Sequence, residues 1–183
     1  YWLQSLHVFD SIDEKTGKAN MLSNIGAVYS NQTEDDKALE YYYRALRTAE
    51  QLNDKLRLAT LYINIGNVYY HNPVNHNKAL EYFKKSLPLC EELEDNNTLG
   101  SACANIGEIY LDRNQFDSAL FYFKKSKTSL DNSEDAAYAL NNLGRFYTKR
   151  GKYDEAIQYH KNAFDTAQKG SATLYMAQSK LYM

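Results

Sequence analysis

A short segment recurs four times along the chain and constrains the fold more than any other feature. Each copy reads Asn, Ile or Leu, Gly, any residue, an apolar residue and Tyr; the copies are Asn24–Tyr29, Asn64–Tyr69, Asn105–Tyr110 and Asn142–Tyr147. They start 40, 41 and 37 residues apart. Self-similarity with a period of about 20–50 residues is typical of repeat proteins. The chain is therefore expected to be an array of small, similar units.

A second segment follows each copy after a stretch rich in turn-forming residues. These second segments are Lys37–Tyr42, Lys78–Phe83, Ser118–Phe123 and Glu155–His160. Apolar residues in both kinds of segment follow helical spacing, as Leu22, Ile25 and Val28 do. Short turns between such helices return the second antiparallel to the first. Each unit is therefore predicted to be a pair of antiparallel helices.

Small residues recur in step with these segments. The first helices carry Gly26, Gly66, Gly107 and Gly144, and the second helices carry Ala38, Ala79, Ala119 and Ala156. A glycine inside a helix costs about 1 kcal/mol relative to alanine, so four in register indicate a packing requirement. We expect each glycine to lie against the alanine and to let the two backbones approach. Aromatic residues, the run Tyr41–Tyr43 included, would then fill the surrounding space.

The pattern resembles the tetratricopeptide repeat family. With each glycine at position eight of the family motif, Ala38, Ala119 and Ala156 fall at position twenty. The family unit has about 34 residues, and the longer spacing here is similar to that of arrays in bacterial signalling proteins and peptide-binding regulators. The resemblance implies an all-α fold, an α-solenoid of antiparallel helix pairs in a right-handed superhelix. It would contain about four full repeats, with half-repeats at both ends.

The resemblance also gives the expected boundaries within a single array over residues 1–183. The four full repeats would span 17–53, 54–94, 95–131 and 132–170. Residues 1–12 would form the second helix of a preceding repeat, and residues 171–183 the first helix of a following one. Both ends look like half-repeats, so we expect the chain to be a piece of a larger protein.

Composition and motifs exclude several classes of function. Lys plus Arg number 21 and Asp plus Glu 23, a balance that does not suit a nucleic-acid or anionic-membrane surface. No phosphate-binding, nucleophile-elbow or zinc-protease motif occurs. The four histidines are scattered, and Cys90 and Cys103 read as small buried apolar residues. We therefore expect no enzyme activity, no metal and no cofactor.

The recurring asparagines are Asn24, Asn64, Asn105 and Asn142. Asparagine is a mediocre helix former, so its recurrence at one helical position asks for a reason. The resemblance implies that first helices line a concave groove, where some members carry an asparagine ladder. An amide side chain donates and accepts, and can hold the backbone of an extended peptide. With helices about 10 Å apart, the groove would fit about nine residues. The alternative, that each asparagine bonds a neighbouring helix, stays open.

Family geometry adds further groove candidates on the first helices. Besides the four asparagines, the candidate peptide-binding residues are Asn67, Tyr70, Glu108, Asn141 and Arg145; other groove positions include Asn20, Ser23 and Thr60. The family's clamp for a chaperone C-terminal carboxylate needs cations where this chain has Ile63 and Tyr138. A chaperone-tail adaptor is therefore disfavoured.

These observations predict a non-catalytic protein- or peptide-binding module, a sensor or scaffold within a larger bacterial signalling or regulatory protein. The alternative is a structural spacer that self-associates into homo-oligomers through its repeat ends. A subunit that only positions the substrate of a hydrolase or transferase is a third reading. We expect no nucleic-acid partner and no insertion into a membrane. The compartment is open: the cytoplasm is the default, and an extracytoplasmic sensor portion of a membrane protein is the alternative.

Overall fold

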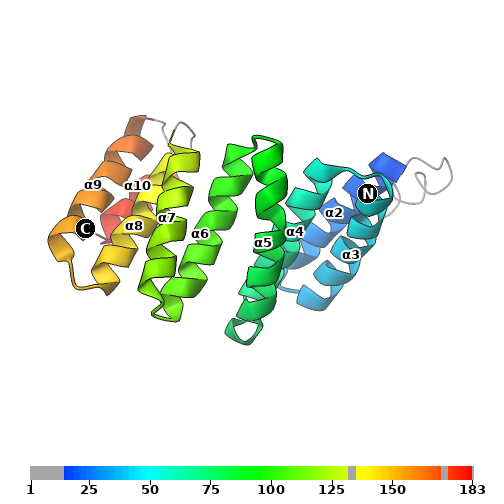
Figure 1. The fold of residues 1–183 in the computed structure, drawn as a ribbon, viewed down its shortest axis with the longest axis horizontal. Helices are drawn as coiled ribbons and strands as arrows, with labels where there is room; N and C mark the ends of the chain where they lie inside the picture. Colours follow the sequence, from blue (N-terminus) through cyan, green and yellow to red (C-terminus); the bar gives the residue numbers. More distant parts are fainter. Residues whose placement is uncertain (1–14, 132–134, 170–172, 183) are drawn as a thin grey trace. The chain divides into compact units, whose positions relative to one another are not determined.

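The computed structural model describes residues 15–131, 135–169 and 173–182 (Figure 1). These residues form nine α-helices and one short 3₁₀ helix, which confirms the predicted all-α fold of antiparallel helix pairs. The predicted helix at residues 1–12 lies outside the described residues. None of the described helices is long and apolar enough to cross a membrane. The chain divides into two compact units, the first ending at Glu94 and the second beginning at Asp95.

The described part of the first unit, residues 15–94, consists of two helix pairs (Figure 1). The pairs are α2 (Lys15–Asn31) with α3 (Asp35–Gln51), and α4 (Lys55–Tyr70) with α5 (His76–Glu92). The 3₁₀ helix η1 (Pro73–Asn75) occupies the longer turn of the second pair, where the Asn72 side chain accepts a hydrogen bond from the Val74 amide at 3.1 Å. Asp54 caps the start of α4, because its carboxylate accepts from the Arg57 amide at 3.0 Å.

The second unit consists of two helix pairs and one further helix. The pairs are α6 (Asn96–Asp112) with α7 (Phe116–Leu130), and α8 (Ala136–Lys149) with α9 (Tyr153–Lys169). The last helix, α10 (Thr173–Tyr182), packs on α9 and α8. Asp95 caps α6 as Asp54 caps α4, accepting from the Thr98 amide at 3.0 Å. The start of each capped helix is therefore fixed by an aspartate in the preceding turn.

Three of the turns inside helix pairs share one geometry. Thr33, Asn114 and Gly151 have positive φ angles of 59°, 57° and 71°. The amide that follows each of them donates to the carbonyl of the tyrosine that ends the repeated segment, as Glu34 does to Tyr29 at 2.9 Å. A left-handed residue with this bond closes the end of an α-helix and reverses the chain. The repeated tyrosine thus lies one turn from each of these chain reversals.

Each repeated glycine makes room for an aromatic ring of the second helix. A methyl group on the glycine would lie between 2.4 and 2.7 Å from the nearest ring atom; the pairs are Gly26 with Tyr42, Gly66 with Phe83, Gly107 with Phe123, and Gly144 with His160. The predicted register of the glycines is confirmed, because all four meet the same position. The residue that fills the space is the ring four positions after the alanine. The alanines are also buried.

Tyrosines join the helices around these crossings. In every repeat the tyrosine of the first helix stacks on one from the second helix; the pairs are Tyr29–Tyr41, Tyr69–Tyr82, Tyr110–Tyr122 and Tyr147–Tyr159, with ring centroids 5.2–5.8 Å apart. The Tyr43 hydroxyl also lies 3.0 Å from that of Tyr69 and 2.9 Å from that of Tyr82. Burial and these two hydrogen bonds raise the pKa of Tyr43 well above its ordinary value. The hydroxyl therefore stays protonated and joins α3 to α4 and α5.

The close approach at Gly66 predicts a measurable cost for the smallest side chain. Gly66→Ala should destabilise the protein by about 1–3 kcal/mol, because the new methyl group would overlap the Phe83 ring. Urea unfolding followed by circular dichroism would measure the change in free energy of unfolding.

Thr60→Ala, an exposed change on the same helix, is the control, and its effect should stay within about 0.5 kcal/mol. Combining Gly66→Ala with Phe83→Leu should cost less than the sum of the two single changes, because the smaller side chain relieves the overlap. Strict additivity would contradict this packing.

Candidate functional site

Two of the recurring asparagines lie on the first helices of the first unit, and neither side chain has a hydrogen-bond partner among residues 15–131, 135–169 and 173–182. Asn24 on α2 is exposed, and Asn64 on α4 is half-buried. Each offers an acceptor and donors at a surface that solvent reaches.

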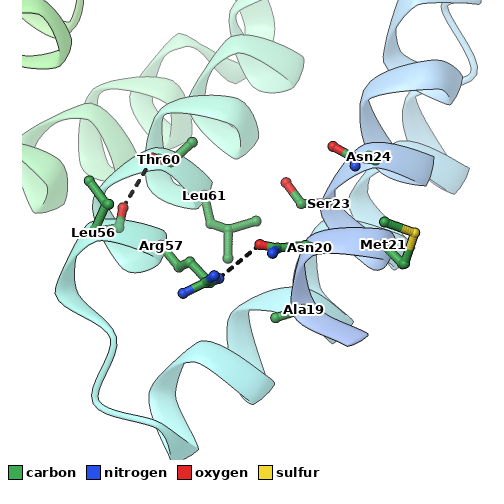
Figure 2. Close-up of a pocket in the computed structure, with 9 residues that line it drawn as sticks. All are labelled: Ala19, Asn20, Met21, Ser23, Asn24, Leu56, Arg57, Thr60 and Leu61. Carbon is green, nitrogen blue, oxygen red and sulfur yellow. Dashed lines mark hydrogen bonds between the residues drawn. The ribbon is translucent and has the colours of Figure 1, made fainter. Parts of the chain in front are cut away.

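A pocket lies between α2 and α4 beside Asn24 (Figure 2). Its volume is about 450 Å³, within the range of about 300–1,000 Å³ that ligand pockets have. The α2 residues that line it are Ala19, Asn20, Met21, Ser23 and Asn24, and the α4 residues are Leu56, Arg57, Thr60 and Leu61. Asn20, Ser23 and Thr60 are among the groove positions predicted from the sequence.

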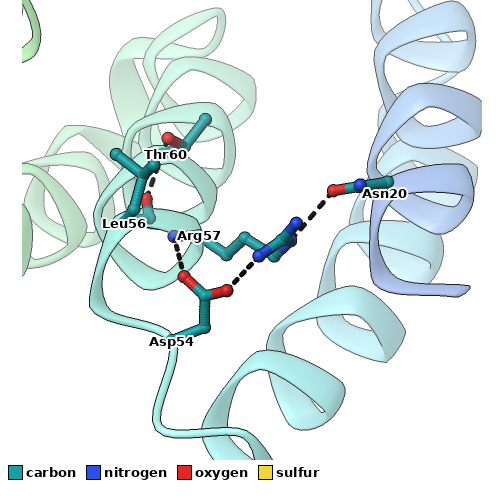
Figure 3. A network of polar contacts seen from close by, with 5 residues as sticks. All are labelled: Asn20, Asp54, Leu56, Arg57 and Thr60. Carbon is teal, nitrogen blue, oxygen red and sulfur yellow. Dashed lines mark hydrogen bonds and ion pairs between the residues drawn. The ribbon is translucent and has the colours of Figure 1, made fainter. Parts of the chain in front are cut away.

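An arginine bridges the two helices at one end of this pocket (Figure 3). The Arg57 guanidinium forms an ion pair with Asp54, and its Nε donates to Asn20 Oδ1 at 2.9 Å. Asp54 and Arg57 are both partly buried. The Thr60 hydroxyl donates to the Leu56 carbonyl at 3.0 Å, so its proton is used within α4. The hydrogen bond to Asn20 joins α2 to α4, and the carboxylate of Asp54 balances the positive charge of Arg57.

The remaining candidates of the first unit lie further along α4. Asn67 is half-buried and has interactions within the protein. Tyr70 is half-buried and stacks on His76, with ring centroids 5.2 Å apart. Neither side chain lines the pocket. The structure thus brings Asn24 to the pocket and places Asn64, Asn67 and Tyr70 along α4 outside it.

In the second unit three of the candidate residues contact one another. Glu108 on α6 and Arg145 on α8 form an ion pair. Arg145 also donates from Nη1 to Asn142 Oδ1 at 3.4 Å. Only 2% of Asn142 is exposed, whereas Asn105 is half-buried and has interactions within the protein. The ion pair therefore joins α6 to α8, and the hydrogen bond to Asn142 lies within α8.

Asn141 lies inside the packing of the last three helices. Its Oδ1 lies 3.0 Å from His160 Nδ1 on α9 and 3.1 Å from the Ser179 hydroxyl on α10. All three residues are buried. Because a carbonyl oxygen only accepts, His160 donates from Nδ1, and its Nε2 has no hydrogen-bond partner in the part of the chain that the structure describes. Burial, reinforced by the Arg145 charge, lowers the pKa of His160.

Comparison with known families agrees with the helix pairs. Family models described as tetratricopeptide repeat match residues 17–72, 100–129 and 136–170, together more than half of the chain. The chain belongs to the tetratricopeptide repeat family. No curated protein sequence matches the chain significantly.

Solved structures with similar repeat arrays include bacterial regulators. Aspartyl phosphate phosphatase F from Bacillus subtilis has a TM-score of 0.89 at 17% identity, over 99% of this chain and 48% of that one. A Rap protein complexed with competence and sporulation factor has a TM-score of 0.83 at 21% identity, over 93% and 48%. The Rap conjugation gene regulator of the plasmid pLS20, in complex with the Phr* peptide, has a TM-score of 0.81 at 18% identity, over 98% and 50%.

These similarities show the fold, and the chain spans about half the length of these relatives. Among the described residues of the array, no group of three or more His, Cys, Asp or Glu side chains could hold a metal ion.

The family motif did not point to Leu56 or Arg57, which lie before the motif positions that line the groove. The sequence indicates the contact between Asp54 and Arg57 only weakly, through an aspartate at a helix start that is followed three residues later by an arginine. Asp54 and Arg57 have this spacing, but the motif alone cannot show that Arg57 reaches Asn20 on another helix.

Because His160 is buried, we expect the stability of this tetratricopeptide repeat array to depend on pH in the acid range. The pKa of folded His160 is lowered, so the unfolded chain takes up this proton first as the pH falls below about 6.5, the ordinary value for histidine. The free energy of unfolding should therefore decrease as the pH falls through this range. Urea unfolding at a series of pH values would measure the decrease.

The matched variant is His160→Phe, since Phe83 and Phe123 occupy the same position in other repeats. His160→Phe should show a shallower decrease with falling pH than the wild type. Equal slopes in the two proteins would show that His160 does not cause the effect.

Proposed function

We propose that this chain is a non-catalytic module that binds an extended peptide or protein segment on the surface formed by α2 and α4. The observation that supports this most is the pocket between these helices, which adjoins the amide of Asn24, a group with no hydrogen-bond partner in the described part of the chain. Asn64 offers a second such amide on α4. Each amide can accept from a peptide N–H and donate to a peptide carbonyl, so a backbone can be held independently of its sequence.

The positions of the polar residues favour a ligand that crosses the two helices. Asn20 and Asn24 lie one turn apart on α2, and Thr60 and Asn64 lie one turn apart on α4. Packed helices are about 10 Å apart, which about three residues of an extended chain span at ~3.3 Å each. We infer that a tripeptide portion of the ligand crosses this surface.

The second unit supports such binding less directly. A ligand at Glu108, Arg145 and Asn142 would have to replace the ion pair and hydrogen bond that these side chains make with one another. Breaking a partly buried charged pair leaves its members unsatisfied and is costly. We therefore assign the primary contact to α2 and α4, and leave Asn105, Asn141, Asn142, Glu108 and Arg145 out of it.

The similar structures support a regulatory role without assigning a ligand. Two of them are Rap proteins solved with a bound factor or peptide. At 21% identity or less these similarities concern the fold, and the chain spans about half of each relative. We propose that the chain is a sensor or scaffold part of a larger signalling protein. We do not transfer the phosphatase activity named for one relative.

Replacing Asn24 and Asn64 tests the proposal. A phage library of random nonapeptides would supply a ligand, and fluorescence anisotropy with the synthetic peptide would give its affinity. Asn24→Ala and Asn64→Ala should each weaken binding about tenfold, because each removes hydrogen bonds worth about 1–2 kcal/mol.

Asn97→Ala, an exposed asparagine on α6, should bind like the wild type. Unchanged affinity in both test variants, with unchanged stability, would exclude the α2–α4 surface. Sedimentation equilibrium with and without the peptide addresses the spacer alternative, since a monomer that binds the peptide one to one does not require self-association.

A further inference from the structure

We propose that the pocket between α2 and α4 selects an uncharged, apolar side chain of the bound peptide, and that Asp54 sets this selectivity by neutralising Arg57. The inference rests on the proposed function, because it names the kind of residue that the same surface would hold. It is carried by the lining of the pocket and by the bridge at its end (Figures 2 and 3).

The apolar part of the pocket is incompletely covered. Ala19 and Leu61 are buried, whereas Leu56 is 54% exposed. All three line the pocket together with Met21. A leucine that is left half in water gains from contact with another apolar group, because apolar surface leaves water on both sides of the contact. This gain is available only to an apolar ligand group.

The charges at the pocket disfavour both acidic and basic ligand groups. Arg57 is the charged residue among those that line the pocket, and Asp54 pairs with it. A carboxylate that approached Arg57 would also approach Asp54, and an ammonium that approached Asp54 would meet Arg57. Neither group would recover the free energy lost when it leaves water. An uncharged side chain avoids that cost.

Hydrogen bonding at the pocket suits a backbone beside such a side chain. Asn20 uses its Oδ1 to accept from Arg57, which leaves its Nδ2 as a donor. Asn24 and Ser23 on the same helix have no recorded partner among the described residues. These groups can hold the peptide units on either side of one residue while its side chain enters the pocket.

Minimal probes test this selectivity directly. N-acetyl-L-leucine amide, N-acetyl-L-aspartate amide and N-acetyl-L-lysine amide each carry one side chain between two peptide groups. Each probe would be titrated into a solution of the full chain, whose leucine and methionine methyl groups carry an isotope label. NMR spectra would record the methyl signals at each step. The leucine probe should shift the Leu56 and Met21 methyl signals in a saturable way. The aspartate and lysine probes should bind at least about tenfold more weakly.

Asp54→Asn is the decisive variant. Asparagine also caps helices well, so α4 should keep its start, but Arg57 would lose its counter-charge. The aspartate probe should then bind at least about tenfold more tightly than to the wild type. Asp95→Asn, at the equivalent cap of α6, is the matched control and should leave every probe unchanged.

Four results would overturn the inference. In the wild type these are no binding of the leucine probe, or tighter binding of the aspartate or lysine probe than of the leucine probe. In the variants they are no gain for the aspartate probe in Asp54→Asn, or an equal gain in Asp95→Asn. Fluorescence anisotropy with the selected peptide distinguishes a failure of the selectivity from a failure of the proposed peptide binding. If selected peptides bind and depend on Asn24 while the leucine probe does not bind, the proposed function stands and the selectivity fails.

Discussion

The fold depends on the contact between a glycine of each first helix and a ring of each second helix. At Gly26, Gly66, Gly107 and Gly144 there is space for the ring only because the backbone carries no Cβ. The helical cost of glycine, about 1 kcal/mol, is offset by the burial of a large apolar side chain, which contributes about 1.5–3 kcal/mol. Everything else in a repeat, the tyrosine stacks included, is arranged around this crossing.

The fourth repeat departs from the apolar version of the contact. The ring against Gly144 is His160, whose polar atoms then require partners inside the helix packing. Asn141 Oδ1 accepts from the Nδ1 of this ring, and the Ser179 hydroxyl lies 3.1 Å from the same oxygen. Asn141, at a position expected to face the groove, is buried, as Ala104 is at the same position of the third repeat. The polar ring in this repeat thus bonds to an asparagine of the first helix.

The repeated motif was sufficient to predict the helix pairs, the turns and the register of the glycines, because these depend on local spacing. It did not predict which residue meets each glycine, since Ala38 and Tyr42 lie one turn apart on the same helix and only packing distinguishes them. The site was less predictable still. Asn24 and Asn142 occupy one motif position, yet one is exposed and the other is buried beside Arg145. Their difference arises from neighbouring repeats, which the motif does not encode.

The hydroxyl of Tyr43 has a consequence for how the first two repeats respond to a ligand. Because it bonds to Tyr69 and Tyr82, the second helix of one repeat cannot separate from either helix of the next without breaking hydrogen bonds between half-buried tyrosines. Repeats in such arrays otherwise interact only through their shared surfaces. Since α2 packs on α3, we expect α2 to α5 to unfold as one cooperative block. A molecule held by α2 and α4 would then protect the amide protons of all four helices from exchange together.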